Sequence, residues 1–292
     1  MKDMVNLILC DLDGTLLRPG HPISASTLET LAALRRQGDI VAIASGRSLY
    51  AGRNIVTHDM PIDFWLFSTG AGIISWQSHE IIRRNELSPE DTRRIATFLL
   101  EANEDFMIQA PVPENHYFVY HRTGRQDNTT TDFDKRCEAF QGFCRPIRDD
   151  EPFSDASQFI AVLPPDEARI NAIRKALADY SVIRATSPMD NHTVWLEIFN
   201  RNAGKGNSAK WLAKEYLPSK EIVVSAVYAI GNDYNDLDML EFADFAFLTS
   251  NAPSPLKELF PVTRHDTDEA FAEAVAQWGI LHGRRCPCHT KS

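Results

Sequence analysis

Residues 5–20 read VNLILCDLDGTLLRPG, and this stretch decides the fold. An apolar run over residues 5–10 leads directly into two aspartates, Asp11 and Asp13. A continuous apolar run of this length, bounded by a turn signal, is typical of a strand buried on both faces. Because alternate side chains of an extended segment point the same way, the two carboxylates converge at the end of the strand. They repel each other, so a cation between them is expected, and Mg²⁺ is a hard ion that prefers such oxygens.

Strands and helices alternate on both sides of this stretch. Residues 40–45 (IVAIAS) and 64–68 (FWLFS) are further apolar runs. A helix is predicted between the first two runs, with Ser26 and Glu29 as its capping box, and another over about 48–57. From residue 204 the alternation returns, with helices from 204 and around 235–242, strands over 222–230 and near 245, and a C-terminal helix. This order predicts a parallel sheet wrapped by helices.

The middle of the chain has a different rhythm, in which predicted hairpins mix with helices. The predicted fold class is therefore α/β: a Rossmann-like parallel-sheet core with an inserted α+β cap domain. The core is expected from residues 1–80 and 191–285 and the cap from 81–190. Residues 286–292 are expected to be a flexible tail, although Cys286, Cys288 and His289 could instead bind a soft metal.

Composition excludes several classes of protein. The 292 residues carry a net charge of −10, which argues against nucleic acid or an anionic membrane surface as a partner. No segment approaches the length of apolar chain that a membrane helix needs. Five cysteines are few and odd in number, which favours reduced thiols and a cytoplasmic location. A small anionic ligand is compatible with all of this, and oligomeric state is not predicted.

Two further motifs are suited to an anion. Ser45, Gly46 and Arg47 follow the second apolar run, where a hydroxyl and backbone N–H groups at a helix start could hold phosphate oxygens. Lys205 lies between two glycines at the start of a predicted helix. It could meet an anion there, although a solvated lysine is the alternative.

A fourth cluster, GNDYNDLD, places polar residues directly after the predicted strand over 222–230. Its side chains are Asn232, Asp233, Asn235, Asp236 and Asp238. Acids at a helix N-terminus are also explained by the helix dipole alone. However, three of the four clusters directly follow an apolar run. They are thus expected to gather at the carboxyl ends of parallel strands, where ligands bind.

The stretches DLDGTL, ASGR, GKG and GNDYND, in this order, resemble the four motifs of the haloacid dehalogenase superfamily. The similarity is greatest to its Cof-type branch of Mg²⁺-dependent phosphatases with a large α/β cap. The resemblance implies hydrolysis of a small phosphorylated metabolite, most simply a sugar phosphate. It implies that Asp11 attacks phosphorus and forms an aspartyl-phosphate, and that Asp13 acts as general acid and base. Ser45, Gly46 and Lys205 would then bind the phosphoryl group.

The resemblance also implies that Arg47 and Asn235 contact substrate, and it identifies two departures from the family pattern. Asn232 stands where the family usually has a metal-binding aspartate, and Thr69 stands where it often has asparagine. The expected metal ligands are Asp11, Asp13, Asn232 and Asp236, with Asp233 less favoured, and weaker Mg²⁺ binding is expected. A phosphomutase and a non-catalytic ligand-binding protein remain the alternatives.

Overall fold

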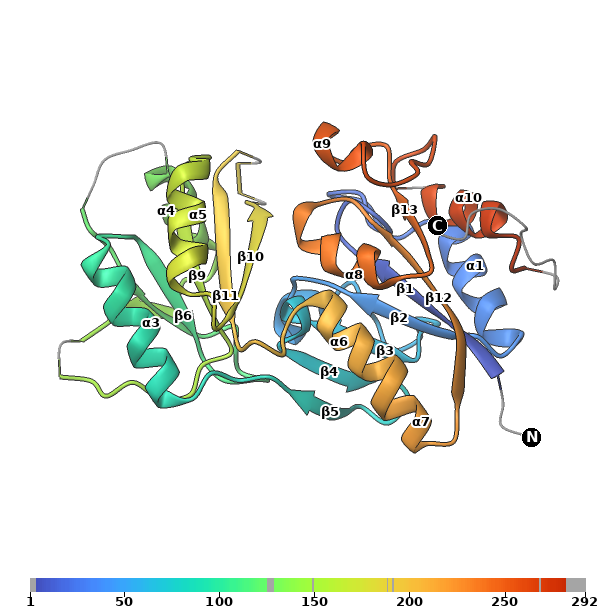
Figure 1. Cartoon of the computed structure of the whole chain (residues 1–292), viewed down its shortest axis with the longest axis horizontal. Coiled ribbons are helices and arrows are strands. Elements are labelled where there is room, and N and C mark those ends of the chain that lie inside the picture. The colour runs from blue at the N-terminus through green and yellow to red at the C-terminus, as the bar shows by residue number, and fades with distance from the viewer. Residues whose placement is uncertain are drawn as a thin grey trace. The chain divides into compact units, whose positions relative to one another are not determined.

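The computed structural model describes residues 4–124, 129–148, 150–187, 189–190, 192–267 and 269–281, and the predicted tail lies outside them. The chain divides into two compact units (Figure 1). The described residues of 1–47, 52–83 and 205–292 form one, named here the core unit. Residues 48–51 and 84–204 form the other, named the cap unit. The cap unit is thus inserted between the two main segments of the core unit.

The core unit is built on a seven-stranded sheet with the order β13-β12-β1-β2-β3-β4-β5. From β13 to β3 the neighbouring strands are parallel, and β4 runs antiparallel to β3. The strands are β1 (Met4–Asp11), β2 (Ile40–Ala44), β3 (Phe64–Phe67), β4 (Gly72–Ser75), β5 (Glu80–Arg84), β12 (Val223–Gly231) and β13 (Phe245–Leu248). The apolar runs at residues 5–10 and 40–45 are confirmed as neighbouring parallel strands at its centre.

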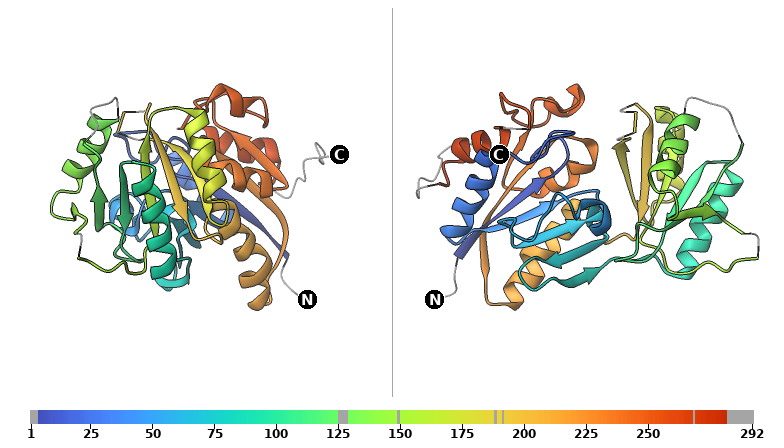
Figure 2. Two further views of the ribbon diagram at one scale, coloured as in Figure 1. Left: turned by 60° about the vertical axis from the view of Figure 1, so that its left-hand side comes forward. Right: turned by 180° about the vertical axis from the view of Figure 1, so that it is seen from behind.

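Helices cover this sheet, as the alternation of apolar runs and helical patterns predicts. Leu7 and Leu9 of β1 share a core cluster with Ala209, Leu212 and Leu240 from the helices that follow the cap unit. Helix α1 packs against β2 and α10, and Figure 2 shows α1 and α10 side by side. The helices of the core unit are α1 (Ala25–Arg36), α6 (Lys205–Trp211), α7 (Leu217–Ser219), α8 (Leu237–Phe242), α9 (Ser254–Lys257) and α10 (Ala270–Trp278), while α2 (Leu49–Gly52) falls largely in the cap unit. A π-helical turn over Leu212–Tyr216 joins α6 to α7, and short 3₁₀ turns cover Ser68–Gly70 and Tyr234–Asp236.

The cap unit contains a six-stranded sheet with the order β10-β11-β9-β6-β7-β8. Its neighbouring strands are antiparallel except β7 and β8, which are parallel. The strands are β6 (Phe106–Gln109), β7 (Phe118–His121), β8 (Cys144–Pro146), β9 (Gln158–Leu163), β10 (Ser181–Thr186) and β11 (Val194–Phe199), and the helices are α3 (Pro89–Glu101), α4 (Thr130–Ala139) and α5 (Glu167–Ala176). The mixed hairpins and helices predicted for this segment are therefore present.

Two details differ from the sequence-based expectation. The predicted core segment began at residue 191, but β11 pairs with β9 and β10 and belongs to the cap sheet. An apolar strand fits either sheet, and only pairing decides between them. The cap of α1 is Ser24, whose side chain accepts a hydrogen bond from the N–H of Thr27, and not Ser26. No helix in the described part of the chain combines the length and apolar character needed to cross a membrane.

Candidate active site

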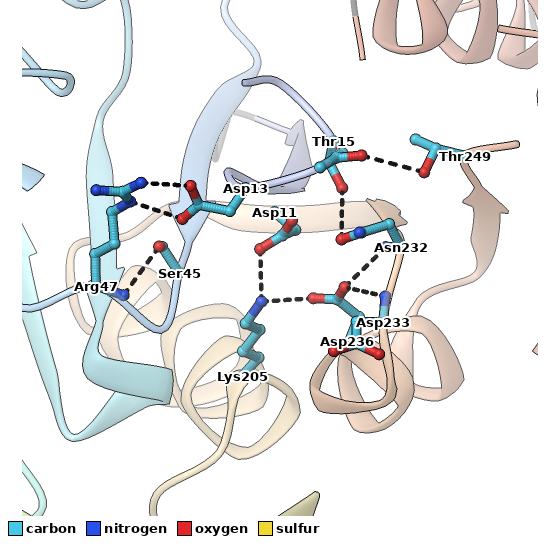
Figure 3. A network of polar contacts seen from close by, with 11 residues as sticks. Asp11, Asp13, Thr15, Ser45, Arg47, Lys205, Asn232, Asp233, Asp236 and Thr249 are labelled. Carbon is cyan, nitrogen blue, oxygen red and sulfur yellow. Dashed lines mark hydrogen bonds and ion pairs between the residues drawn. The ribbon is translucent and has the colours of Figure 1, made fainter. Parts of the chain in front are cut away.

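Three of the predicted motif residues, Asp11, Lys205 and Asp236, form one buried charge network in the core unit (Figure 3). Asp11 is the last residue of β1, and its side chain is buried at the carboxyl end of that strand. Lys205 begins α6 and is 0% exposed. Its Nζ lies 2.7 Å from Asp11 Oδ1 and 2.6 Å from Asp236 Oδ1. One lysine thus bridges two buried carboxylates that come from different ends of the chain.

Burial and the neighbouring charges shift the pKa of Asp11 and of Lys205. Burial raises the pKa of the Asp11 carboxyl, the Asp236 carboxylate raises it further, and Lys205 opposes both. Burial alone would lower the pKa of Lys205, but the two adjacent carboxylates outweigh it and raise the pKa overall. A buried ammonium between two carboxylates therefore stays charged, and its removal leaves two like charges facing each other.

Asp236 anchors the loop that carries Asn232. Its Oδ1 accepts from Lys205, and its Oδ2 accepts from the N–H groups of Asn232 at 2.8 Å and Asp233 at 3.0 Å. Both Asp236 oxygens thus face donors, and the role of Asp236 as a metal ligand stays a prediction. The predicted alternative, Asp233, caps the 3₁₀ turn with its side chain. Sequence reasoning could not separate these roles, since all the acids lie within a few residues.

The oxygens beside Asp11 are chemically suited to a divalent cation. One atom of the Asn232 amide lies 3.1 Å from both Asp11 Oδ2 and the carbonyl oxygen of Asp13. With nitrogen in that position, the amide donates to both oxygens. With oxygen there, three oxygens converge, as a hard cation requires. The described residues contain no group of three or more His, Cys, Asp or Glu side chains suited to a metal, so this oxygen set depends on an amide and a backbone carbonyl.

The turn after β1 contacts the residues that follow β13 and the loop that carries Asn232. Gly14 has φ +83°, and a Cβ there would lie 2.3 Å from Asn232 Nδ2, so only glycine fits. Its carbonyl accepts from Asn251 Nδ2 at 2.9 Å and from Thr249 Oγ1 at 3.3 Å. Sequence analysis did not identify Thr249 and Asn251, because no charge or motif distinguishes them. They orient the turn that carries the Asp13 carbonyl.

The second motif lies beside the first. Ser45 is 0% exposed, and its Oγ accepts from the N–H of Arg47 at 3.1 Å. The Arg47 guanidinium forms a two-pronged ion pair with Asp13, with Nε and Nη2 lying 2.8 and 2.7 Å from the carboxylate oxygens. The guanidinium thus pairs with a carboxylate in this structure, and a contact between Arg47 and substrate stays a prediction.

Three more polar residues border Gly46 and Ser45. A Cβ on Gly46 would lie 3.6 Å from Thr69 Oγ1 and 4.0 Å from Asn235 Nδ2, so both side chains flank this glycine. Ser68 and Thr69 have φ of 48° and 51°, a left-handed conformation that is unfavourable for residues other than glycine and most of all for the β-branched Thr69. The N–H of Thr69 bonds the Ser45 carbonyl at 2.9 Å, which holds this strained segment against the second motif.

Comparison with known proteins agrees with this fold. The family model of the haloacid dehalogenase-like hydrolases matches residues 8–277. A putative phosphatase of Mycoplasma pneumoniae is 25% identical over 269 residues, which cover 88% of this chain and 91% of that protein. The 5-amino-6-(5-phospho-D-ribitylamino)uracil phosphatase YwtE of Bacillus subtilis is 24% identical, covering 90% and 93%. A solved structure described as the subclass IIB sugar phosphatase BT4131 has a TM-score of 0.71 at 19% identity, covering 95% and 100%, and supports the fold.

The chain therefore belongs to the haloacid dehalogenase-like hydrolases, and with its inserted cap to their Cof-type phosphatase branch. Membership in this family implies a divalent metal, typically Mg²⁺, which agrees with the convergent oxygens of Asp11, Asp13 and Asn232.

Proposed function

We propose that this protein is a cytoplasmic, Mg²⁺-dependent phosphatase that hydrolyses a small phosphorylated metabolite, with a sugar or polyol phosphate as the favoured class. The observation that carries the proposal is the buried Lys205 between Asp11 and Asp236, next to the oxygens of Asn232 and Asp13. The substrate class is supported by two relatives named for a sugar phosphatase and for a phosphoribitylamino-uracil phosphatase.

In the proposed reaction Asp11 supplies the nucleophile. Its carboxylate attacks phosphorus, the P–O bond to the leaving group breaks, and an aspartyl-phosphate forms. Lys205 holds Asp11 Oδ1 at 2.7 Å, which orients the carboxylate and offsets the negative charge that gathers around it. A bound Mg²⁺, held by Asp11, the Asp13 carbonyl and Asn232, would lower the repulsion between the carboxylate and the phosphate. Ser45 and the backbone at Gly46 would bind phosphoryl oxygens.

Asp13 is the proposed general acid and base. It donates a proton to the leaving oxygen and later takes one from the water that hydrolyses the aspartyl-phosphate. Its carboxylate is 46% exposed and paired with Arg47. Arg47 would thus hold the Asp13 side chain at the site until that side chain reaches the leaving group.

The test is phosphate release from a panel of sugar, polyol, nucleotide and cofactor phosphates, with Mg²⁺ and with a chelator. We expect release that requires Mg²⁺ and that Asp11→Asn abolishes. Asp59→Asn, at an exposed position in the core unit, is the matched control and should keep full activity. No release from any ester by folded, Mg²⁺-bound protein would refute the proposal, and conversion to an isomeric phosphate would favour a phosphomutase.

Asn232 permits a second test. Asn232→Asp adds a negative charge to the oxygen set, so Mg²⁺ should bind more tightly than in the wild type. The measurement is the Mg²⁺ concentration that gives half of the metal-induced rise in Tm. A gain in affinity with little change in turnover agrees with a working phosphatase. A large gain in turnover from a nearly inactive wild type would favour the non-catalytic alternative.

A further inference from the structure

Two cysteines lie at the two ends of one tight turn in the cap unit. Cys137 is in the last turn of α4, and Cys144 is the first residue of β8. Between them Gly142 has φ +88°, and the N–H of Phe143 donates to the carbonyl of Phe140 at 2.8 Å. A positive φ suits glycine and lets the chain reverse here. The strand therefore starts beside the end of the helix.

The thiols of these two cysteines are in contact. Cys144 Sγ donates to the carbonyl oxygen of Cys137 at 3.6 Å, and the two side chains also form a hydrogen bond with each other. Both pack against the cluster that contains Phe118 and Trp195. Each residue is partly exposed, so a small reagent in solution has access to the pair. Contact between the thiols meets the first requirement of a disulfide, because cysteines held farther apart are joined only after the backbone moves.

Cys10 of β1, the third cysteine in the described part of the chain, has different surroundings. It is 0% exposed, and burial raises the pKa of its thiol well above the usual value. A fully buried thiol with a raised pKa is inert, because oxidants react with an accessible thiolate. Cys10 is therefore a structural residue and an internal control for the reactivity of the pair.

The surroundings of the pair give each thiol a different role. Burial raises the pKa of Cys137 to about 12, and the charge of Cys144 and the hydrogen bond with it add to this shift. Cys137 is therefore protonated at neutral pH and is a poor first nucleophile. The contribution from the charge of Cys144 disappears once Cys144 is bonded to another sulfur. Cys144 is thus suited to meet an oxidant, and Cys137 is suited to close the bond afterwards.

We propose that Cys137 and Cys144 are a redox-sensitive site of the cap unit, which forms a reversible disulfide by exchange with a small-molecule disulfide such as glutathione disulfide. The Cys144 thiolate attacks one sulfur of the oxidant, the S–S bond of the oxidant breaks, and one thiol leaves. Cys137 loses its proton and attacks Cys144 Sγ, and the second thiol leaves. Two cysteine thiols are oxidised, and one molecule of disulfide is reduced to two thiols. This proposal does not rest on the proposed phosphatase function.

The disulfide would attach the end of α4 to β8, which is an edge strand of the cap sheet. Near the start of the same helix, Asp132 Oδ2 accepts from Trp195 Nε1 of β11 at 2.8 Å. The helix would then be fastened to its sheet at both ends, so oxidation should stabilise the cap unit. A bond that stabilises the folded state is stabilised by folding to the same extent. Closure should therefore be about tenfold more favourable in the folded chain than in the unfolded chain.

The test uses the full chain with Cys286→Ser and Cys288→Ser, so that these two cysteines, which lie outside the described residues, do not compete. The protein is equilibrated in glutathione buffers of stepped redox potential, both folded and in concentrated urea. Acid stops the exchange, and free thiols are then alkylated in denaturant. Mass spectrometry of the peptides gives the fraction of chains with a bond between Cys137 and Cys144. Cys10 should be found as a free thiol throughout the folded series.

We expect the disulfide to form in the folded protein with an equilibrium constant about tenfold larger than in urea, and to be reversed by dithiothreitol. The Tm of the oxidised protein should exceed that of the reduced protein by about 3 °C or more. Cys137→Ser should abolish this difference in Tm and leave one glutathione attached at Cys144. If the serine variant does not fold, Cys137→Ala replaces it, and the measurement on the unaltered pair needs neither variant.

Three results would overturn the proposal. The first is an equilibrium constant no larger in the folded chain than in urea. The second is a Tm that falls when the pair is oxidised. The third is folded protein that carries glutathione at Cys144, or remains fully reduced, with no bond to Cys137 in any buffer. Phosphate release is not measured, so the outcome is independent of the proposed phosphatase function.

Discussion

Asp238 should make the core unit less stable at neutral pH than at acid pH. It lies on α8 and accepts hydrogen bonds from the backbone N–H groups of Gly206 and Met239, while its Oδ1 has no partner among the described residues. Burial, partly offset by those hydrogen bonds and by Lys205, raises its pKa from 3.8 to about 6. The folded state thus holds the proton to a higher pH than the unfolded state. Stability is therefore lost as the pH rises through this window.

The size of the effect follows from the shift. About two pKa units correspond to roughly 3 kcal/mol, at 1.36 kcal/mol per unit. Asp238→Asn keeps an oxygen for the Gly206 and Met239 N–H groups and carries no charge. Its gain in unfolding free energy over the wild type should grow from about 1 kcal/mol at pH 4.5 to at most about 3 kcal/mol at pH 7.5.

The assay is urea unfolding at both pH values, in metal-free buffer, followed by tryptophan fluorescence. Glu241→Gln, at an exposed position of the same helix, is the control and should show no gain that depends on pH. A variant that is less stable than the wild type at pH 7.5, or a gain of equal size at both pH values, would refute the burial argument.

Two further predictions concern the same helices. Lys205→Met leaves Asp236 facing a second buried carboxylate and should cost about 3–5 kcal/mol of unfolding free energy, and adding Asp236→Asn should restore part of it. A Lys205→Met protein that is as stable as the wild type in urea would contradict this prediction. Gly206→Ala places a Cβ 2.3 Å from the Asp238 carbonyl oxygen and should cost about 1–3 kcal/mol. Gly46→Ala, whose nearest atom would be 3.6 Å away, should leave Tm nearly unchanged; equal losses in Tm would argue against close packing at Gly206.

Local patterns in the sequence were sufficient for the central sheet and for most of the site. Apart from Asn6 and Ser45, the runs at residues 5–10 and 40–45 are apolar at every position, which is typical of a strand buried on both faces. Asp11 follows the first run and Ser45 ends the second, and neighbouring parallel strands bring their carboxyl ends to the same side of the sheet. Their proximity was thus predictable without coordinates.

Partner choice was not predictable in the same way. The sequence allowed Arg47 to reach substrate and Asp236 to bind metal, whereas Arg47 pairs with Asp13 and Asp236 pairs with Lys205. Neither residue has an opposite charge within five positions along the chain, so each partner comes from a distant segment that only the fold brings close. The strand at 194–199 was assigned to the core for a similar reason, since its apolar pattern fits either sheet.

The sequence alone therefore determined which residue types meet at the sheet edge, because strand direction and apolar pattern are local properties of the chain. The fold selected the partners: Asn232 with the Asp13 carbonyl, Lys205 between two carboxylates, and Gln109 beside Gln158. Such pairings depend on register between strands far apart in sequence. Burial then sets their energies, since a charge or an amide is costly only where water is excluded.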